Sequence, residues 1–172
     1  MAEKTPVTNS PVASGPVKRA TFFGIHDRDI TTNKQAAIPK AFKRVLGATG
    51  EDELLAAHFH WENEKFLRLY TKTKLDELIE AVNNDEGYTE AQRAEKIRMI
   101  ANSAEPVEPD SQGRFVIPAR FYDLLGFKDA VVFEGCYTHI WLWPAQAHKE
   151  KLAAQQKQPQ QPDTRLTTML SR

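Results

Sequence analysis

Residues 38–47 read Ile-Pro-Lys-Ala-Phe-Lys-Arg-Val-Leu-Gly, and residues 117–126 read Ile-Pro-Ala-Arg-Phe-Tyr-Asp-Leu-Leu-Gly. The two stretches share isoleucine, proline, phenylalanine, leucine and glycine at the same spacing. A unit of this size cannot bury its apolar side chains alone, so two copies predict a pseudo-twofold core to which both contribute. The function is then expected on a surface that the doubled unit presents to a partner.

Each copy predicts a strand followed by a short helix. Proline fits the first turn of a helix, because its missing N–H would have no partner there. The expected helices are 40–46 and 119–125, each with phenylalanine and leucine four residues apart on one face. Gly47 and Gly126 are expected to end these helices in the left-handed conformation.

Further elements are expected on both sides of the repeated pattern. The predicted strands are 57–61 and 65–70 around a turn at 62–64, and 130–134 and 138–143 around a turn at 135–137. The predicted further helices are 73–84, 89–102 with Thr89 as its cap, and 144–153. The first copy is longer by six residues, and this insertion is expected near residues 48–55.

The chain is expected to be an α+β protein with two pseudo-symmetric hairpin and helix repeats. Both ends are rich in small polar residues and proline without periodicity, which is typical of disorder. The predicted segments are a disordered arm at 1–20, the first repeat at 21–84, a connecting helix at 85–105, the second repeat at 106–154 and a disordered tail at 155–172.

The composition is that of a folded protein without a membrane segment. The chain has 172 residues, of which 41% are hydrophobic and 27% are charged. No apolar run reaches the roughly 18 residues that a membrane-spanning helix requires, and the first residues lack the apolar stretch of a secretory signal. The single cysteine, Cys136, cannot form an internal disulfide and is expected to be a half-buried strand thiol.

The net charge is zero, but the charges are unevenly distributed along the chain. Residues 18–44 contain seven basic and two acidic side chains, whereas residues 51–105 contain thirteen acidic and seven basic ones. A molecule polarised in this way can present a locally positive face to DNA. The alternative is that these charges only solvate the surface.

The turn before the second Ile-Pro strand reads Asp110-Ser-Gln-Gly-Arg114. An Asx-type turn with glycine at a position of positive φ suits these residues. It places Asp110 and Arg114 across the turn, where an ion pair would orient the guanidinium group. An oriented guanidinium with spare donors suits a guanine edge or a phosphate. A purely structural salt bridge is the alternative.

The pattern Asp-x-x-Gly-Arg, followed by two residues and Ile-Pro in a chain with two such units, resembles the MraZ family. The opening Phe22-Phe23-Gly24 resembles the Phe-Arg-Gly start of that family. Residues 133–143, Phe-Glu-Gly-Cys-Tyr-Thr-His-Ile-Trp-Leu-Trp, resemble its closing hairpin. The resemblance extends over about residues 20–150.

The resemblance implies the AbrB/SpoVT-like fold, in which two swapped-hairpin and helix repeats form a small β-barrel-like core with flanking helices. It implies a cytoplasmic, nucleoid-associated bacterial regulator of transcription. Members of the family form homo-oligomeric rings and bind short direct repeats in double-stranded DNA upstream of the division and cell-wall gene cluster. The resemblance implies no cofactor, no membrane and no small-molecule substrate.

The family pairs an aspartate with an arginine four residues later in each copy, and associates the arginine with DNA. Copy one departs from this pattern with Thr31 and Gln35, and Phe23 replaces the arginine of the opening motif. Glutamine can form two hydrogen bonds with adenine, as arginine can with guanine, so Gln35 could change the base that copy one prefers. The alternative is that copy one contributes only to the fold. The candidate DNA contacts are Arg114, Asp110, Gln35, Lys34, Lys40, Lys43 and Arg28, with Arg44 as a further phosphate contact.

Enzymatic and metal chemistry find little support in the sequence. The chain has no glycine-rich nucleotide loop, zinc-protease motif or serine-hydrolase motif, so no enzyme is predicted. His58 and His60 would share one face of a strand and could bind a metal, but a polar strand face is the simpler interpretation. Trp61, Trp141 and Trp143 are expected to be core or interface anchors, because they lie in apolar strands.

A rival function is an oligomeric assembly or adaptor protein that kept the fold and lost DNA binding. The altered first copy and the acidic region favour it. Salt dependence distinguishes the two functions, because a protein that contacts several phosphates loses affinity for DNA steeply as the salt concentration rises.

Overall fold

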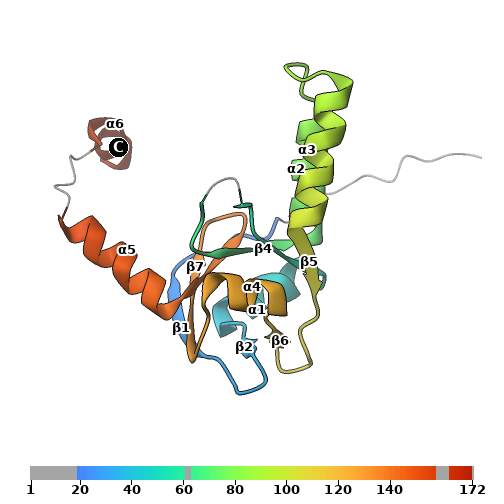
Figure 1. Cartoon of the computed structure of the whole chain (residues 1–172). Coiled ribbons are helices and arrows are strands. Elements are labelled where there is room, and N and C mark those ends of the chain that lie inside the picture. Colours follow the sequence, from blue (N-terminus) through green and yellow to red (C-terminus); the bar gives the residue numbers. More distant parts are fainter. Residues whose placement is uncertain (1–18, 61–62, 158–162, 172) are drawn as a thin grey trace, which may run out of the picture.

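The computed structural model describes residues 19–60, 63–157 and 163–171 and shows an α+β fold (Figure 1). One order of elements, β-β-α-β-β-α, occurs twice. In copy one the elements are β1 (Ile25–Asp29), β2 (Gln35–Ala37), α1 (Lys40–Thr49), β3 (Leu54–Ala57), β4 (Leu67–Thr71) and α2 (Lys72–Asn83). In copy two they are β5 (Ala104–Val107), β6 (Arg114–Val116), α4 (Ala119–Leu125), β7 (Ala130–Gly135), β8 (Ile140–Pro144) and α5 (Ala145–Lys157). Helix α3 (Glu90–Ser103) connects the copies, and α6 (Thr164–Leu170) follows the second.

The strands form one antiparallel sheet of six strands and a separate ribbon of two. The sheet has the order β1-β7-β8-β4-β3-β5, and the ribbon consists of β2 and β6. The predicted β-barrel-like core is therefore wrong for the described residues, because the sheet is open with β1 and β5 at its edges. Since β2 and β6 pair with each other, neither of them bridges those edges to close a barrel.

The two copies are interleaved through their strand pairing. Strand β1 of copy one pairs with β7 of copy two, and β5 of copy two pairs with β3 of copy one. In the middle of the sheet, Leu67 of β4 pairs with Leu142 of β8, and Leu69 pairs with Ile140. Leu67 and Ile140 are equivalent positions of the repeat, as are Leu69 and Leu142. The exchanged pairing shows that a pseudo-twofold axis passes through the centre of the sheet.

The core lies between the sheet and the two short helices α1 and α4, which cross the middle of the molecule in Figure 1. Both helices follow an Ile-Pro pair, with Pro39 and Pro118 at their N-caps. Phenylalanines from both copies dominate the core, and each exposes 1% of its surface or less: Phe22, Phe42, Phe115, Phe121 and Phe133. The core is therefore shared between the copies, as the repeated motif predicts.

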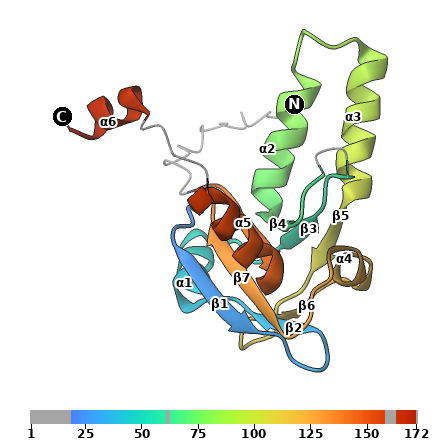
Figure 2. The same cartoon turned by 60° about the vertical axis from the view of Figure 1, so that its left-hand side comes forward.

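Helices α2 and α3 form a hairpin that projects from the rest of the molecule (Figure 2). Leu75 and Ile100 are buried between this hairpin and the sheet. The Thr89 hydroxyl caps α3 by accepting a hydrogen bond from the backbone amide of Gln92, and the Gln92 side-chain oxygen accepts one from the backbone amide of Thr89. This capping box fixes the start of α3 and confirms the predicted cap.

Copy one departs from the predicted boundaries. Helix α1 continues through Gly47, where its end is predicted, and is capped by Gly50, which has a φ of 72°. Gly126 caps α4 as predicted, and its φ is also 72°. The strand predicted at 57–61 lies instead at 54–57. Because α1 runs about one turn further than α4, and residues 50–53 then lead into β3, part of the insertion lengthens the helix and part lies between β3 and β4.

The predicted termini are covered only in part. Residues 1–18, 158–162 and 172 lie outside the described residues, as do Trp61 and Glu62. Where a disordered tail is predicted, α5 continues to Lys157 and α6 forms. Helix α6 begins because the Asp163 carboxylate accepts hydrogen bonds from the amides of Arg165 and Leu166. Among the described residues, no helix combines the length and the apolar character needed to cross a membrane.

Candidate nucleic-acid interface

The β2–β6 ribbon presents one face to the core and the other outward. Ala36 and Phe115 form its central pair and are 0% and 1% exposed. Since side chains alternate along a strand, their neighbours lie on the outer face: Gln35, Ala37, Arg114 and Val116. The ribbon and its turns lie at the end of the molecule opposite the α2–α3 hairpin (Figures 1 and 2). A two-stranded ribbon is one of the elements that the major groove of DNA admits.

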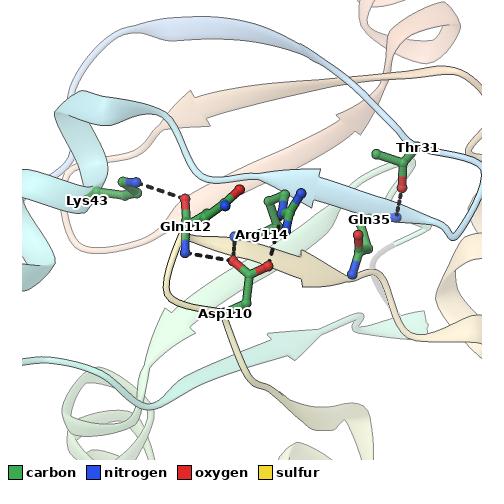
Figure 3. Close-up of polar contacts among 6 residues, drawn as sticks. All are labelled: Thr31, Gln35, Lys43, Asp110, Gln112 and Arg114. Atoms are coloured by element: carbon green, nitrogen blue, oxygen red, sulfur yellow. Dashed lines mark hydrogen bonds and ion pairs between the residues drawn. The ribbon is translucent and has the colours of Figure 1, made fainter.

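The turn at 110–114 is held by one carboxylate (Figure 3). Asp110 Oδ1 accepts hydrogen bonds from the backbone amides of Gln112 and Arg114, both at 2.9 Å. The backbone closes the turn, because Asp110 N donates to Arg114 O at 2.8 Å and Gly113 N donates to Asp110 O at 2.8 Å. Gly113 has a φ of 78°, which suits glycine. The predicted Asx-type turn is therefore confirmed.

Arg114 is oriented by the same carboxylate. Its Nε donates to Asp110 Oδ2 at 2.9 Å (Figure 3), while 43% of the side chain remains exposed. The Arg114 backbone amide, and then its side chain, lower the pKa of Asp110, so this carboxylate stays ionised. Within the part of the chain that the structure describes, the two Nη groups of Arg114 have no acceptor. They remain available for a guanine edge or a phosphate.

The turn at 31–35 of copy one has the same backbone form with different side chains. Thr31 N donates to Gln35 O and Lys34 N donates to Thr31 O, both at 2.9 Å. The Thr31 hydroxyl takes the place of the carboxylate and accepts from Gln35 N at 3.2 Å (Figure 3). Lys34 has a φ of 58° where copy two has Gly113. Copy one therefore keeps the turn and lacks the ion pair.

Each turn is bonded to the other copy. Ile38 N donates to Gly113 O at 2.9 Å, and Ile117 N donates to Lys34 O at 2.9 Å. These two bonds are pseudo-twofold mates, because Ile38 and Ile117 are equivalent, as are Lys34 and Gly113. The two turns are thus held in equivalent positions at the two ends of the ribbon.

Two of the predicted phosphate contacts lie against the opposite copy. Lys43 Nζ of α1 donates to Gln112 O in the turn of copy two at 2.9 Å (Figure 3). Lys34 Nζ lies 3.5 Å from Asp123 Oδ1 and 4.6 Å from the centre of the Tyr122 ring in α4. Both ammonium groups therefore connect a turn of one copy to the helix of the other.

The sequence prediction missed these two connections. Lys43 and Tyr122 are equivalent positions of the repeat, as are Gly113 and Lys34. The cation comes from the helix in one connection and from the turn in the other. Complementary residues at equivalent positions were the signal that could have revealed them.

The remaining predicted cations are placed differently. Lys40 and Arg44 are exposed on α1, which follows the ribbon directly. Arg28 lies on β1, at the edge of the large sheet, where its Nη1 donates to the carbonyl of Asp27 at 2.6 Å. The structure therefore brings Arg114, Gln35 and the two turns together on the ribbon, and places Arg28 outside it.

The two histidines proposed as alternative metal ligands contact each other. The Nδ1 atoms of His58 and His60 lie 3.1 Å apart, and His58 Nε2 lies 3.1 Å from the carbonyl of Glu64. Such distances fit a chain of hydrogen bonds between imidazoles and backbone. The described residues contain no group of three or more side chains suited to hold a metal ion.

Replacing Gly113 by alanine should lower the free energy of unfolding by about 1–2 kcal/mol, because a positive φ strains a residue with a Cβ. The new Cβ would also overlap the Lys43 side chain. Urea denaturation measures the change. Gly47→Ala is the matched control: no atom lies within 4 Å of its new Cβ, and it should stabilise α1 by up to about 1 kcal/mol. Equal effects of the two substitutions would contradict the strained turn.

Comparison with known proteins finds relatives along most of the chain. Residues 100–170 match the family described as "MraZ protein, putative antitoxin-like". The Transcriptional regulator MraZ of Anaeromyxobacter dehalogenans (strain 2CP-C) is 24% identical over 135 residues, which cover 78% of this chain and 91% of the relative. The Transcriptional regulator MraZ of Bacteroides fragilis (strain YCH46) is 27% identical over 140 residues, which cover 79% and 84%.

Proposed function

From the resemblance to MraZ, which these comparisons confirm, we propose that the chain is a sequence-specific DNA-binding regulator of transcription. The relatives carry the name of a transcriptional regulator. The observation that carries the proposal is Arg114, which Asp110 orients on the outer face of an exposed two-stranded ribbon. Such a ribbon fits the major groove, and an arginine can donate two hydrogen bonds to one guanine.

The charges around the ribbon support this assignment. Lys40 and Arg44 stand exposed on α1 directly after β2, where they can reach phosphates beside the groove. The acidic α2–α3 hairpin lies at the other end of the molecule (Figure 1). A chain with no net charge can therefore approach DNA with one basic end.

The finer proposal follows the family: subunits assemble into a ring that binds short direct repeats upstream of the division and cell-wall gene cluster, in the cytoplasm at the nucleoid. The strand exchange between copies supports the swapped-hairpin, AbrB-like relationship. Edge strand β1 supports assembly, because Phe23, Ile25 and Tyr137 beside it are 67%, 55% and 59% exposed. Several weak sites on one ring gain affinity by avidity. Light scattering of the free protein measures the number of subunits.

Fluorescence anisotropy tests the proposed function. The protein is titrated against duplex DNA from upstream of its own gene and against a scrambled duplex, at two salt concentrations. We expect Arg114→Ala to weaken binding to the upstream DNA by about 5- to 150-fold, the value of one bidentate contact to a base. Binding by the unmodified protein should fall steeply with salt.

Arg98→Ala is the matched control for Arg114→Ala. Arg98 is also an exposed arginine in an ion pair, with Glu95, but it lies on α3 away from the ribbon. It should leave the affinity for DNA unchanged. Equal loss in both variants, or equal binding of upstream and scrambled DNA by the unmodified protein, would reject DNA readout by the ribbon.

The adaptor function remains the second candidate, on one observation. Lys34 and Lys43 direct their ammonium groups to the opposite copy, so copy one offers fewer cations to DNA than its sequence indicates. An oligomer that binds neither duplex at low salt would favour the adaptor.

A further inference from the structure

We propose that each subunit binds an asymmetric DNA element in a single orientation, with Arg114 at a guanine and Gln35 at an adenine. The proposal rests on the DNA-binding function proposed above. It concerns the two ends of the β2–β6 ribbon, which are equal in backbone geometry and different in chemistry. It goes beyond that function by assigning a base class to copy one and a direction to the bound subunit.

The ribbon is symmetric in its pairing. Gln35 and Arg114 are equivalent residues, and the register pairs Gln35 with Val116 and Ala37 with Arg114. Rotation about the pseudo-twofold axis through the Ala36–Phe115 pair therefore exchanges the two ends. With the same side chains at both ends, the ribbon would fit one DNA element equally well in two opposite orientations.

The two ends of the ribbon share one backbone geometry. Thr31 N donates to Gln35 O at 2.9 Å, and Asp110 N donates to Arg114 O at 2.8 Å. The residue after each turn also receives the same local bond, from its amide to the Thr31 hydroxyl at 3.2 Å or to Asp110 Oδ1 at 2.9 Å. Gln35 and Arg114 therefore approach the groove from equivalent positions. Copy one has kept the geometry of a base contact.

The two ends differ in the hydrogen-bonding groups of their side chains. Arg114 offers donors only, which match the two acceptors of guanine in the major groove. Gln35 offers one donor and one acceptor, which match N7 and the N6 amine of adenine. The exchange is consistent on both sides of the turn, since the neutral Gln35 side chain needs no counter-ion, and a Thr31 hydroxyl bonded to the Gln35 backbone amide stands where Arg114 has the Asp110 carboxylate.

The unlike ends of the ribbon give the bound subunit one orientation on its DNA element. Turning the subunit around would place Arg114 at adenine and Gln35 at guanine, which leaves donors and acceptors mismatched at both ends. A ring with cyclic symmetry carries every ribbon in the same direction around its rim. Subunits that bind in one orientation then require successive elements to point the same way.

Tethered DNA cleavage tests the orientation. Thr32 and Ser111 are equivalent exposed residues, one in each turn. Thr32→Cys and Ser111→Cys, each with Cys136→Ser, carry an iron–EDTA reagent and are bound to a duplex that the unmodified protein selects from a random library. We expect each position to cut one end of the element, and the two positions to cut opposite ends. Equal cutting at both ends from each position would overturn the proposal.

Two symmetric variants complete the test. Thr31→Asp/Gln35→Arg makes both ends arginine, and Asp110→Thr/Arg114→Gln makes both ends glutamine. We expect libraries selected with them to be rich in guanine or in adenine at both ends, and each tethered reagent to cut both ends. Replacing the adenine at the Gln35 end by guanine should weaken the unmodified protein about tenfold, and unchanged affinity would overturn the assignment of Gln35.

Failure of the proposed function has a different signature. If the unmodified protein enriches no duplex from the library, DNA readout itself fails. If it enriches a duplex that both reagents cut symmetrically, DNA binding stands and the orientation fails. Circular dichroism of the variants confirms that each remains folded, and since two opposite symmetric variants are made, loss of folding in one leaves the other to decide.

Discussion

Replacing Phe115 by alanine should lower the free energy of unfolding by about 3–5 kcal/mol, the usual cost of removing a buried phenylalanine ring. The side chain is 1% exposed, and its ring meets that of Phe133 edge-on at 6.4 Å. It pairs with Ala36 across the pseudo-twofold axis, so one large and one small residue share this position. Alanine on both strands would leave a cavity directly under the ribbon.

Val116→Ala is the control for Phe115→Ala. Val116 is the next residue of β6, but it lies on the outer face and is 51% exposed. Its truncation should change stability by about 0.5 kcal/mol or less. Urea denaturation followed by circular dichroism measures both variants. A loss below about 1 kcal/mol for Phe115→Ala would contradict a shared core at this position.

Replacing Gly135 by alanine should cost about 2–3 kcal/mol, as overpacking of a well-filled site does. A Cβ at Gly135 would lie 2.6 Å from Phe22 C and Phe23 N and 2.7 Å from Phe22 O. These are backbone atoms and cannot rotate away as a side chain can. The segment carrying Phe22 would have to leave β7, although Phe22 is 1% exposed in the core and its amide donates to Tyr137 O at 2.7 Å.

Hydrogen exchange of the Phe22 and Tyr137 amides reports this displacement directly. Both amide hydrogens should exchange much faster in Gly135→Ala, since each amide donates to the backbone carbonyl of the other residue and both hydrogen bonds would be broken. Gly47→Ala serves again as the control, because its new Cβ meets no atom within 4 Å. Unchanged stability and unchanged exchange in Gly135→Ala would show that the segment is not packed against β7.

The sequence predicts what local chemistry determines. The Ile-Pro pairs mark both short helices, and Asp110 with Gly113 and Arg114 marks the turn, because each pattern satisfies backbone groups within a few residues. The Thr89 cap follows from the same local rule. These are the parts of the fold and of the candidate interface that the sequence predicts correctly.

Long-range pairing is where the sequence prediction fails. No local sequence pattern predicts that β1 pairs with β7. Likewise, none predicts that β2 pairs with β6 instead of closing a barrel. The position of β3 along the chain is equally ambiguous, because apolar and polar residues continue to alternate beyond Ala57. His58 and Phe59 are both buried, although they lie outside the strand. The contact of Lys43 with the Gln112 carbonyl depends on the same long-range placement, so it is visible only in three dimensions.

The exchange of strands β1 and β5 between the copies makes the chain a tethered heterodimer. Each half contributes an edge strand to the strands of the other, so neither half forms a complete sheet by itself. Helix α3 is the covalent link between the two halves. Because the shared core fixes the frame, the two ends of the ribbon's outer face can carry unlike side chains without loss of structure. A single chain can in this way hold two different sets of outward side chains at a fixed spacing, as a heterodimer of two gene products would.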